Sequence, residues 1–525
     1  MERQARGSAW AIATPHTVAT EAGAVAFERG GNAIDAALAA AVTLAVSYPH
    51  NCGVGGDLFA LVQRPDGDAI AINASGRAPA GVDPDAVRAR HGTTMPDHGP
   101  DPITVPGAVS GWAALHHEGA RLPWPEAFGA AIALAHGGVA VSRSLADMLE
   151  LHAERFASDP GLAAIFFDRG RPLPRGALVR QPALGNTLSA LATDGPGALY
   201  RGPVGARYVA GLRARGCTIT VEDLAGHTAD VVPPVIGRYR DLDLRVVPPN
   251  NQGFALLEIL GMVERLGLDP DPFGPDAGAL ALSFLAAGRD RDRHLADPEA
   301  MLVHISTLLD DGHLAGLADE VRGALPADPV SPRARPAGDT IALVAADREG
   351  WAVSLIQSLF DGFGAGILEP ETGITAHDRG ACFTLEPGHP NELAPGKRPA
   401  HTLMPVLVHR GGRLAAVAGT MGGHAQPHIN AQNLLRAFDL GMPAADAVAA
   451  PRFTVWDEPR GPLALAEGLV PDDAVDGLRA AGFEVDRLPD RDEAVGHSHL
   501  IMVGPEGTFE VGTDPRADGG ALASS

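Results

Sequence analysis

Thr340 is the residue whose surroundings best suit nucleophilic chemistry. It follows Gly338-Asp339 at the end of a Pro-rich segment and opens an apolar stretch that runs to residue 346. A threonine hydroxyl attacks a carbonyl only when a base lies within hydrogen-bond reach. Cutting the peptide bond between Asp339 and Thr340 would free an α-amino group, whose ordinary pKa of about 7.7–8.0 suits proton transfer. The pattern suggests a self-made nucleophile, although β-branched threonines also begin strands for conformational reasons alone.

A glycine pair, Gly422-Gly423, is the second candidate for chemistry. It ends the stretch Gly419-Thr420-Met421-Gly422-Gly423, ahead of a helix expected from about 426 to 438. Two successive N–H groups without side chains can turn towards a developing alkoxide, and each such donor is often worth about 10²–10³ in rate. A tight turn before a helix is the simpler interpretation of the same pair.

Other familiar sites are missing from the sequence. There is no G-x-S-x-G elbow and no Walker loop, and Gly53-Val54-Gly55-Gly56 precedes a strand rather than a helix, unlike a dinucleotide fingerprint. Histidines 424 and 428, and 497 and 499, have spacings that would allow metal binding, but no carboxylate or cysteine completes a usual set. We expect no metal and no cofactor, and interpret these histidines as polar groups near a pocket.

The composition is that of a globular protein with an acidic surface. Its 525 residues carry a formal net charge of −23, which disfavours nucleic acid and anionic membranes but not a small anionic substrate. Halophilic or acidophilic adaptation would also explain the charge. The three cysteines are too few and too far apart for a disulfide framework or a CxxC zinc site.

The N-terminal residues show no apolar segment typical of a secretory signal, and no run reaches the roughly 18 apolar residues of a membrane span. These features and the free thiols predict a cytoplasmic protein. A chain already trimmed of its signal would have the same pattern.

The elements that must position these residues follow from periodicity and turn signals. Asn32 is expected to cap an Ala-rich helix, and residues 123–325 are mainly helical, with strands near 239–247. Residues 326–338 form an exposed Pro-rich connector, which alone could be a plain interdomain linker. Strands are expected at 10–13, 58–63, 69–73, 340–346, 351–359, 403–408 and 414–418. Strands with helices around them suggest antiparallel sheets between helical layers.

Short motifs in a fixed order run along nearly the whole chain. The N-terminal ones are Ala13-Thr14-Pro15-His16, Gly30-Gly31-Asn32-Ala33-Ile34-Asp35-Ala36, Pro49-His50-Asn51, Gly53-Val54-Gly55-Gly56, Val105-Pro106-Gly107 and Pro248-Pro249-Asn250-Asn251-Gln252-Gly253. The C-terminal ones are Thr340, Asp347, Gly350, Gly364, Gly366, Gly373-Ile374, Gly396-Lys397-Arg398-Pro399, Pro405, Gly422-Gly423, Pro451-Arg452-Phe453 and Asp514-Pro515-Arg516. Together they resemble the γ-glutamyltranspeptidase family of N-terminal-nucleophile hydrolases.

The resemblance implies an α/β (α+β) protein with a four-layer αββα sandwich, made by cutting one precursor. Residues 1–339, with the connector at about 326–339, would form the large subunit, and residues 340–525 the small one. Together they would form one αββα unit. By the same resemblance Thr340 is the nucleophile, Ser358 steers its proton, and Gly422 and Gly423 form the oxyanion hole. The substrate is then a small molecule, by default a γ-glutamyl compound such as glutathione.

The residues expected to read the substrate depart from the family pattern. Ser75 stands where glutathione-cleaving members have an arginine for the α-carboxylate, with Arg77 two residues further on. Cys382 replaces the acid that reads the α-amino group, and a thiol does not neutralise an ammonium unless ionised. His401 and Thr402 stand in place of paired serines.

These departures favour a carboxylate-bearing substrate read by Arg379 and Arg77, with no acid for an amine. They resemble a side branch that includes oxamate amidohydrolase-like members and natural-product enzymes that cleave carbon–carbon bonds. Ile341 and Ala342 stand where the family has threonine and histidine. They support the alternative hypothesis of an unprocessed, inactive binding protein. A higher homo-oligomer also remains possible.

Overall fold

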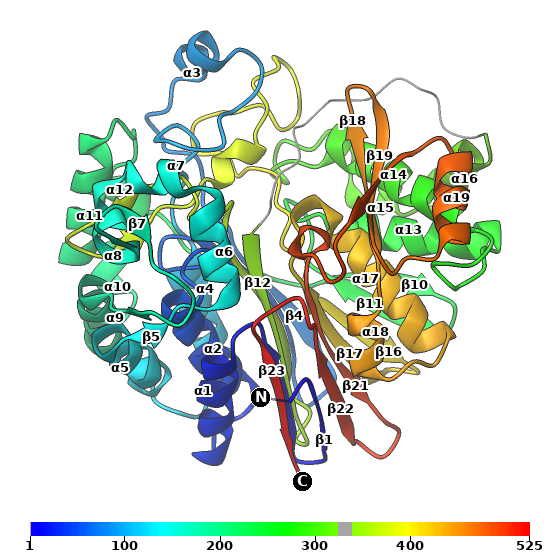
Figure 1. The fold of residues 1–525 in the computed structure, drawn as a ribbon, viewed down its shortest axis with the longest axis horizontal. Coiled ribbons are helices and arrows are strands. Elements are labelled where there is room, and N and C mark those ends of the chain that lie inside the picture. Colours follow the sequence, from blue (N-terminus) through cyan, green and yellow to red (C-terminus); the bar gives the residue numbers. More distant parts are fainter. Residues whose placement is uncertain (1, 324–338) are drawn as a thin grey trace.

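The computed structural model describes residues 2–323 and 339–525. The predicted Pro-rich connector, apart from residue 339, lies outside the described residues. Two seven-stranded antiparallel sheets stack face to face, and a layer of helices covers the outer face of each (Figure 1). The structure thus confirms the predicted αββα sandwich.

The first sheet contains the strand expected at residue 340, in the order β23-β2-β12-β13-β3-β4-β9. Its strands are β23 (Gly520–Ser524), β2 (Trp10–Thr14), β12 (Asp339–Asp347), β13 (Ala352–Phe360), β3 (Asp57–Gln63), β4 (Ala69–Ala74) and β9 (Asp230–Val232). The strands from the two ends of the chain, β23 and β2, therefore lie together on the β12 side of the β12–β13 hairpin.

The second sheet has the order β1-β22-β21-β17-β16-β11-β10. Its strands are β1 (Gln4–Gly7), β22 (Phe509–Thr513), β21 (Ser498–Val503), β17 (Arg413–Thr420), β16 (Val406–Arg410), β11 (Leu242–Val246) and β10 (Val235–Tyr239). The strands expected near 239–247 form a hairpin that begins earlier, at Val235, because the chain turns back at residues 240 and 241.

One helical layer covers the first sheet. Its helices include α1 (Thr17–Glu28), α2 (Ala33–Ser47), α4 (Ala108–His117), α5 (Gly129–Gly137), α9 (Pro182–Asp194), α10 (Gly197–Tyr200), α11 (Pro203–Ala214) and α12 (Val221–Ala225). The predicted cap of α2 is present as a capping box, in which Asn32 accepts from the backbone of Asp35 and Asp35 accepts from that of Asn32. Every residue of α2 is buried, so its small side chains allow close packing on the sheet.

The other helical layer covers the second sheet. It contains α13 (Gly253–Leu266), α14 (Ala277–His294), α16 (Asp311–Arg322), α17 (Gln426–Leu434), α18 (Ala444–Ala449) and α19 (Asp472–Ala480). The helix expected from about 426 to 438 ends earlier as an α-helix and continues as a π-helical turn, Leu435–Asp439. A small sheet of β18 (Phe453–Glu458), β19 (Gly461–Glu467) and β20 (Glu484–Leu488) flanks this layer.

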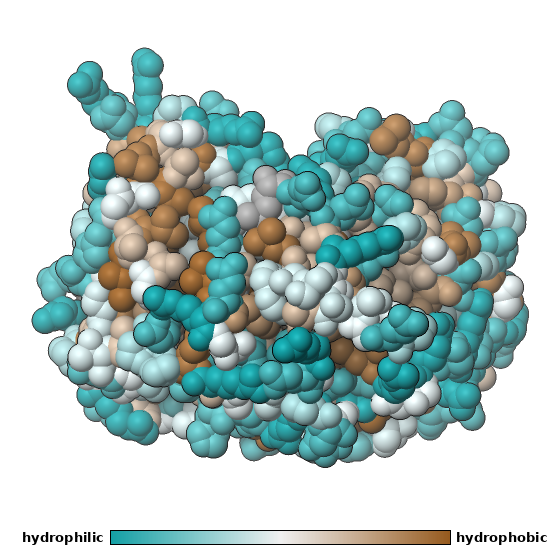
Figure 2. Space-filling model, turned by 90° about the horizontal axis from the view of Figure 1, so that it is seen from below, coloured by the Kyte–Doolittle hydropathy of each residue, from teal (hydrophilic) through white to brown (hydrophobic). Residues whose placement is uncertain are grey.

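The remaining elements are short. They are α3 (Pro84–His91), α6 (Arg143–Leu151), α7 (Ala153–Ala157), α8 (Pro160–Phe166), α15 (Ile305–Leu308), β5 (Val139–Ala140), β6 (Phe167–Asp168), β7 (Arg171–Pro172), β8 (Leu178–Val179), β14 (Leu368–Glu369) and β15 (Ile374–Thr375), with 3-10 turns at Trp124–Phe128, Arg379–Cys382, Gly423–Ala425 and Glu493–Val495. Figure 2 shows polar residues over much of one face of the molecule, with apolar patches between them. Among the described residues we find no helix with the length and apolar character of a membrane span.

Strand alternation determines which residues of β12 face the space between the sheets. Ile341, Leu343 and Ala345 pack in the core under the first helical layer, whereas Ala342 and Val344 belong to the apolar core shared by the two sheets. Successive side chains of a strand point to opposite faces. Thr340 therefore faces the space between the sheets, near the start of β12.

Candidate active site

The predicted nucleophile and its predicted hydroxyl neighbour lie side by side. Thr340 and Ser358 are paired across the β12–β13 hairpin, and their hydroxyl oxygens are 2.9 Å apart. Both residues are buried, and the Asn51 side-chain amide donates to the Thr340 carbonyl at 3.2 Å. The Ser358 hydroxyl also accepts from the Phe360 backbone at 2.8 Å, which fixes its position. A proton can therefore pass between the two hydroxyls without a rearrangement.

Strand β17 brings the glycine pair to the same end of the sandwich. A side-chain carbon on Gly419 would lie only 3.3 Å from the Ala342 side chain, so β17 crosses closely over the start of β12. The chain then turns through Gly422 (φ 146°) and Gly423 (φ 54°), a region that residues with side chains rarely adopt. A side-chain carbon on Gly422 would also collide with Ile429, at 2.5 Å. This turn requires glycine for both conformation and space.

Arg379 is a buried cation beside the hairpin. Its side chain is 1% exposed, and the guanidinium lies 4.0 Å from the centre of the Phe360 ring. Nη1 donates to the Thr402 hydroxyl at 3.0 Å and to the Cys382 sulfur at 3.5 Å. Its Nε and Nη2 have no hydrogen-bond partner among the described residues. Buried donors are nearly always paired, so these two nitrogens are suited to an anionic ligand.

Two carboxyl groups near Arg379 do not fully neutralise it. Burial and mutual repulsion raise the pKa of Asp378 well above its ordinary range, and burial raises the pKa of Asp361 to about 6. The Asp361 backbone donates to Asp378 at 3.1 Å, so the two residues are held together. Both carboxyl groups therefore favour the protonated form more than an exposed aspartate does, which weakens their neutralisation of the Arg379 charge.

A second buried network holds the chain around residue 401. His401 Nε2 donates to Asp57 Oδ2 at 3.1 Å, and His401 Nδ1 lies 3.4 Å from the Leu403 backbone nitrogen. Burial and Arg379 lower the pKa of His401 to about 3. Burial alone would raise the pKa of Asp57, but His377, His401 and Arg379 lower it to about 2. Both ring nitrogens of His401 thus face protein groups, an arrangement that favours positioning over direct contact with substrate.

Gln252 links the Thr402 segment to the glycine turn. Its side-chain amide donates to the carbonyls of Thr402 at 2.8 Å and Gly423 at 3.0 Å. Arg291 in turn donates to Gln252 Oε1 and to the His424 carbonyl, both at 3.1 Å. The sequence motif that contains Gln252 predicts no role for this side chain, and nothing in the sequence points to Arg291. An arginine within an otherwise ordinary helix carries no local signal of such a contact.

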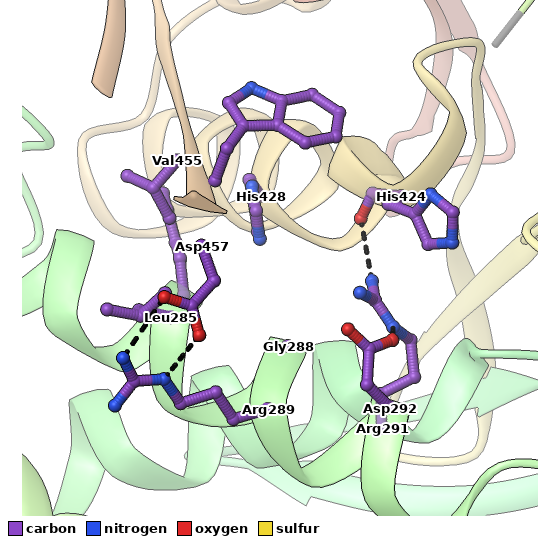
Figure 3. Close-up of a pocket in the computed structure, with 11 residues that line it drawn as sticks. Leu285, Gly288, Arg289, Arg291, Asp292, His424, His428, Val455 and Asp457 are labelled. Carbon is purple, nitrogen blue, oxygen red and sulfur yellow. Dashed lines mark hydrogen bonds and ion pairs between the residues drawn. The ribbon is translucent and has the colours of Figure 1, made fainter. Parts of the chain in front are cut away.

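Two adjoining pockets open beside this network. One is lined by Gln252, Arg291, Asp292, Leu295, Asn391, Ala400, His401, Thr402 and His424. Arg291, Asp292 and His424 also line the second pocket, where Arg289 forms a two-point ion pair with Asp457 and Arg291 reaches the His424 backbone (Figure 3). His428 stacks on Phe284 there, with ring centres 4.6 Å apart. The pockets place Thr402 and His401 beside accessible space.

Arg77 is placed differently from Arg379. Its Nη1 donates to Asp297 at 3.2 Å and to the Gly396 carbonyl at 3.0 Å, and its side chain is 41% exposed. Ser75, at the position of the family arginine, donates its hydroxyl hydrogen to Asn73 at 2.7 Å. The structure therefore brings Arg379, Cys382 and Thr402 into contact, and gives Arg77 an acidic partner of its own.

The αββα sandwich defines a hydrolase of the N-terminal-nucleophile class. The chain belongs to the gamma-glutamyltranspeptidase family, whose model matches residues 19–524. It is 36% identical to the oxamate amidohydrolase proenzyme of Klebsiella pneumoniae, over 97% of each chain, and 30% identical to the glutathione hydrolase proenzyme of Escherichia coli, over 96% of this chain and 90% of that one.

Solved structures agree with this assignment. The cephalosporin acylase from Bacillus halodurans superposes with a TM-score of 0.91 at 31% identity, covering 100% of this chain and 97% of that one. These relatives are named as hydrolases, acylases and proenzymes. The protein is accordingly an enzyme of the hydrolase and acyltransferase type.

Proposed function

We propose that the protein is an autoprocessing amidohydrolase that cuts itself before Thr340 and then uses Thr340 to attack an amide. The observation that carries this proposal is the contact between the Thr340 and Ser358 hydroxyl groups. Arg379, whose Nε and Nη2 have no hydrogen-bond partner among the described residues, supports it. The proenzyme names of the relatives support processing. The cut would divide the chain into residues 1–339 and 340–525.

The proposed reaction needs no group beyond the chain and water. The freed α-amino group of Thr340 accepts the hydroxyl proton as Oγ1 bonds to the amide carbon, and Ser358 guides that proton. Backbone N–H groups of Gly422 and Gly423 stabilise the resulting alkoxide. The C–N bond then breaks and the leaving amine takes the proton. Water next attacks the acyl-threonine ester, which releases a carboxylic acid and restores the hydroxyl.

The substrate that fits best is a small amide carrying a carboxylate. Arg379 offers two nitrogens without a hydrogen-bond partner among the described residues, and Cys382, where family members read an ammonium with an acid, instead lies against that guanidinium. An ammonium at this position would face a cation. The name of the Klebsiella relative, an oxamate amidohydrolase, points to the same substrate class. A γ-glutamyl amide such as glutathione is the second candidate, favoured by the Escherichia coli relative.

A denaturing gel with mass spectrometry tests the processing step. The purified wild-type chain should give two fragments that meet at Thr340, and Thr340→Ala should remain one band, because no hydroxyl is left to attack. Ser189→Ala, which removes a hydroxyl on helix α9, is a matched control that should process normally. A wild-type chain that stays uncut would overturn the proposal and favour a binding protein.

An amide panel tests the substrate. Oxamate-like amides should turn over faster than γ-glutamyl-anilide, whereas the reverse order would establish the second candidate.

A further inference from the structure

Three ligand-type side chains converge in the outer helical layer that covers the second sheet. Glu258 lies on α13, Asp290 on α14 and His313 on α16, three helices that pack against one another (Figure 1). Their carboxylate oxygens and imidazole nitrogen all lie within 4.8 Å of one another. His313 Nε2 is 3.0 Å from Asp290 and 3.9 Å from Glu258. The cluster is separate from Thr340, which lies on the first sheet.

Glu258 has no partner that explains its burial. It stands in the apolar stretch Leu257-Glu258-Ile259 and is 0% exposed, and neither of its oxygens has a hydrogen-bond partner among the described residues. The Oδ1 atom of Asp290 has no hydrogen-bond partner either. Two adjacent buried carboxyl groups repel one another when both are charged. Either a proton or a cation must neutralise such a pair.

Apart from His313, none of the nearby basic groups forms an ion pair with Glu258. Arg291, the next residue on α14, is turned towards Gln252 and His424. Arg293 and His294 approach only Asp290 Oδ1, at 3.7 Å and 3.6 Å, and neither is paired with Glu258. His313 is 24% exposed, so one member of the cluster is in contact with solvent.

We propose that Glu258, Asp290 and His313 bind a divalent first-row transition ion such as Zn²⁺. One imidazole with two carboxylates suits such ions, whereas Ca²⁺ prefers a larger set of oxygen ligands. His294, four residues after Asp290 on the same helix, lies 3.6 Å from Asp290 Oδ1 and outside the three-residue cluster, so water would complete the coordination. The ion would tie α13, α14 and α16 together. Because Arg291 follows Asp290 on α14, a bound ion would also hold Arg291, the residue that donates to Gln252, in place.

Isothermal titration of Zn²⁺ into the full-length, chelator-treated protein tests this proposal. The wild type should bind about one equivalent tightly, and its melting temperature should rise with Zn²⁺ concentration. Glu258→Gln and His313→Ala should weaken this binding at least tenfold, since even residues that support a metal ligand cost about that much. Ca²⁺ should give no comparable binding.

His117→Ala is the matched control, because it removes an exposed histidine from the other helical layer. It should bind Zn²⁺ like the wild type. Circular dichroism shows whether each variant folds, and the Co²⁺ absorption spectrum of the wild type reports the ligand field without any variant. Zn²⁺ binding that is absent, or unaffected by Glu258→Gln and His313→Ala, would overturn the proposal and leave Glu258 as a protonated acid. These measurements do not depend on the activity of Thr340.

Discussion

Arg379 shows how much one residue can reveal about a ligand. Only Nη1 of the guanidinium donates hydrogen bonds to other described residues, to the Thr402 hydroxyl and the Cys382 sulfur. The guanidinium also lies over the Phe360 ring. A buried cation kept without a full partner is costly, because water no longer solvates it. A carboxylate on the substrate would supply the missing partner, and the charge would then select among amides.

Replacing Arg379 with methionine should abolish this selection. We expect kcat/KM for a carboxylate-bearing amide to fall by about 10²–10⁴-fold, since losing one partner of a buried ion pair costs about 3–5 kcal/mol. The same amide without its carboxylate should be affected far less. Steady-state kinetics on the two amides provide the measurement.

Arg77→Met is the control for this experiment, because Arg77 already pairs with Asp297. It should leave the preference for the carboxylate intact. If Arg77→Met rather than Arg379→Met removed the preference, the assignment of the carboxylate site would be wrong.

At the scale of elements, the site depends on where two strands meet. β12 supplies Thr340 at its start, and β17 delivers the Gly422–Gly423 turn at its end, close above Ala342. The β12–β13 hairpin was predictable, because two apolar runs flank a turn at Asp347 to Gly350, and the observed strands match the expected ones to within a residue at most ends.

The contacts between distant segments were beyond sequence reasoning. Asp57 and His401 are 344 positions apart, and only the stacking of the sheets brings them together. The Arg291–Gln252 contact likewise depends on how α14 lies against the start of α13. Residue types and local spacing do not predict such pairs. The sequence therefore predicts a carboxylate-binding role for both Arg77 and Arg379, and only the structure shows that Arg77 already pairs with Asp297.

Gly422→Ala tests the glycine turn. An added methyl group would collide with Ile429 and should shift the N–H groups, which should lower kcat by about 10²–10³-fold. Gly412→Ala is a matched control, since Gly412 also has positive φ (78°) but has open space around it, in the β16–β17 turn. It should cost about 1–3 kcal/mol of stability and little activity. Equal kcat values for the two variants would argue against an oxyanion role.

At the scale of the whole molecule, buried histidines dominate the response to acid. Burial lowers the pKa of eight of them to about 3 or 4, against an ordinary value of 6.5: His16, His50, His227, His401, His409, His428, His497 and His499. Below pH 6.5 the unfolded chain therefore binds protons that the folded chain excludes. The carboxyl groups whose pKa is raised act in the opposite sense but are fewer: Glu258, Asp347, Asp361, Asp378, Asp439 and Glu493.

Stability should consequently fall steeply from pH 6.5 towards pH 4. Each excluded proton lowers the free energy of unfolding by about 1.4 kcal/mol per pH unit. Calorimetric melting temperatures across this range provide the measurement, and His499→Gln should make the fall shallower. A melting temperature that stays constant down to pH 4.5 would contradict this account.

The strand orders have a consequence for the proposed cut. In the first sheet β23, β12 and β13 from the C-terminal portion alternate with β2, β3, β4 and β9 from the N-terminal portion, and in the second sheet β1, β10 and β11 enclose β16, β17, β21 and β22. Each sheet would therefore contain interleaved strands from both fragments. Cleavage would then break one peptide bond without allowing the two subunits to separate. Each pair of subunits would come from one precursor, and subunits would not exchange between molecules.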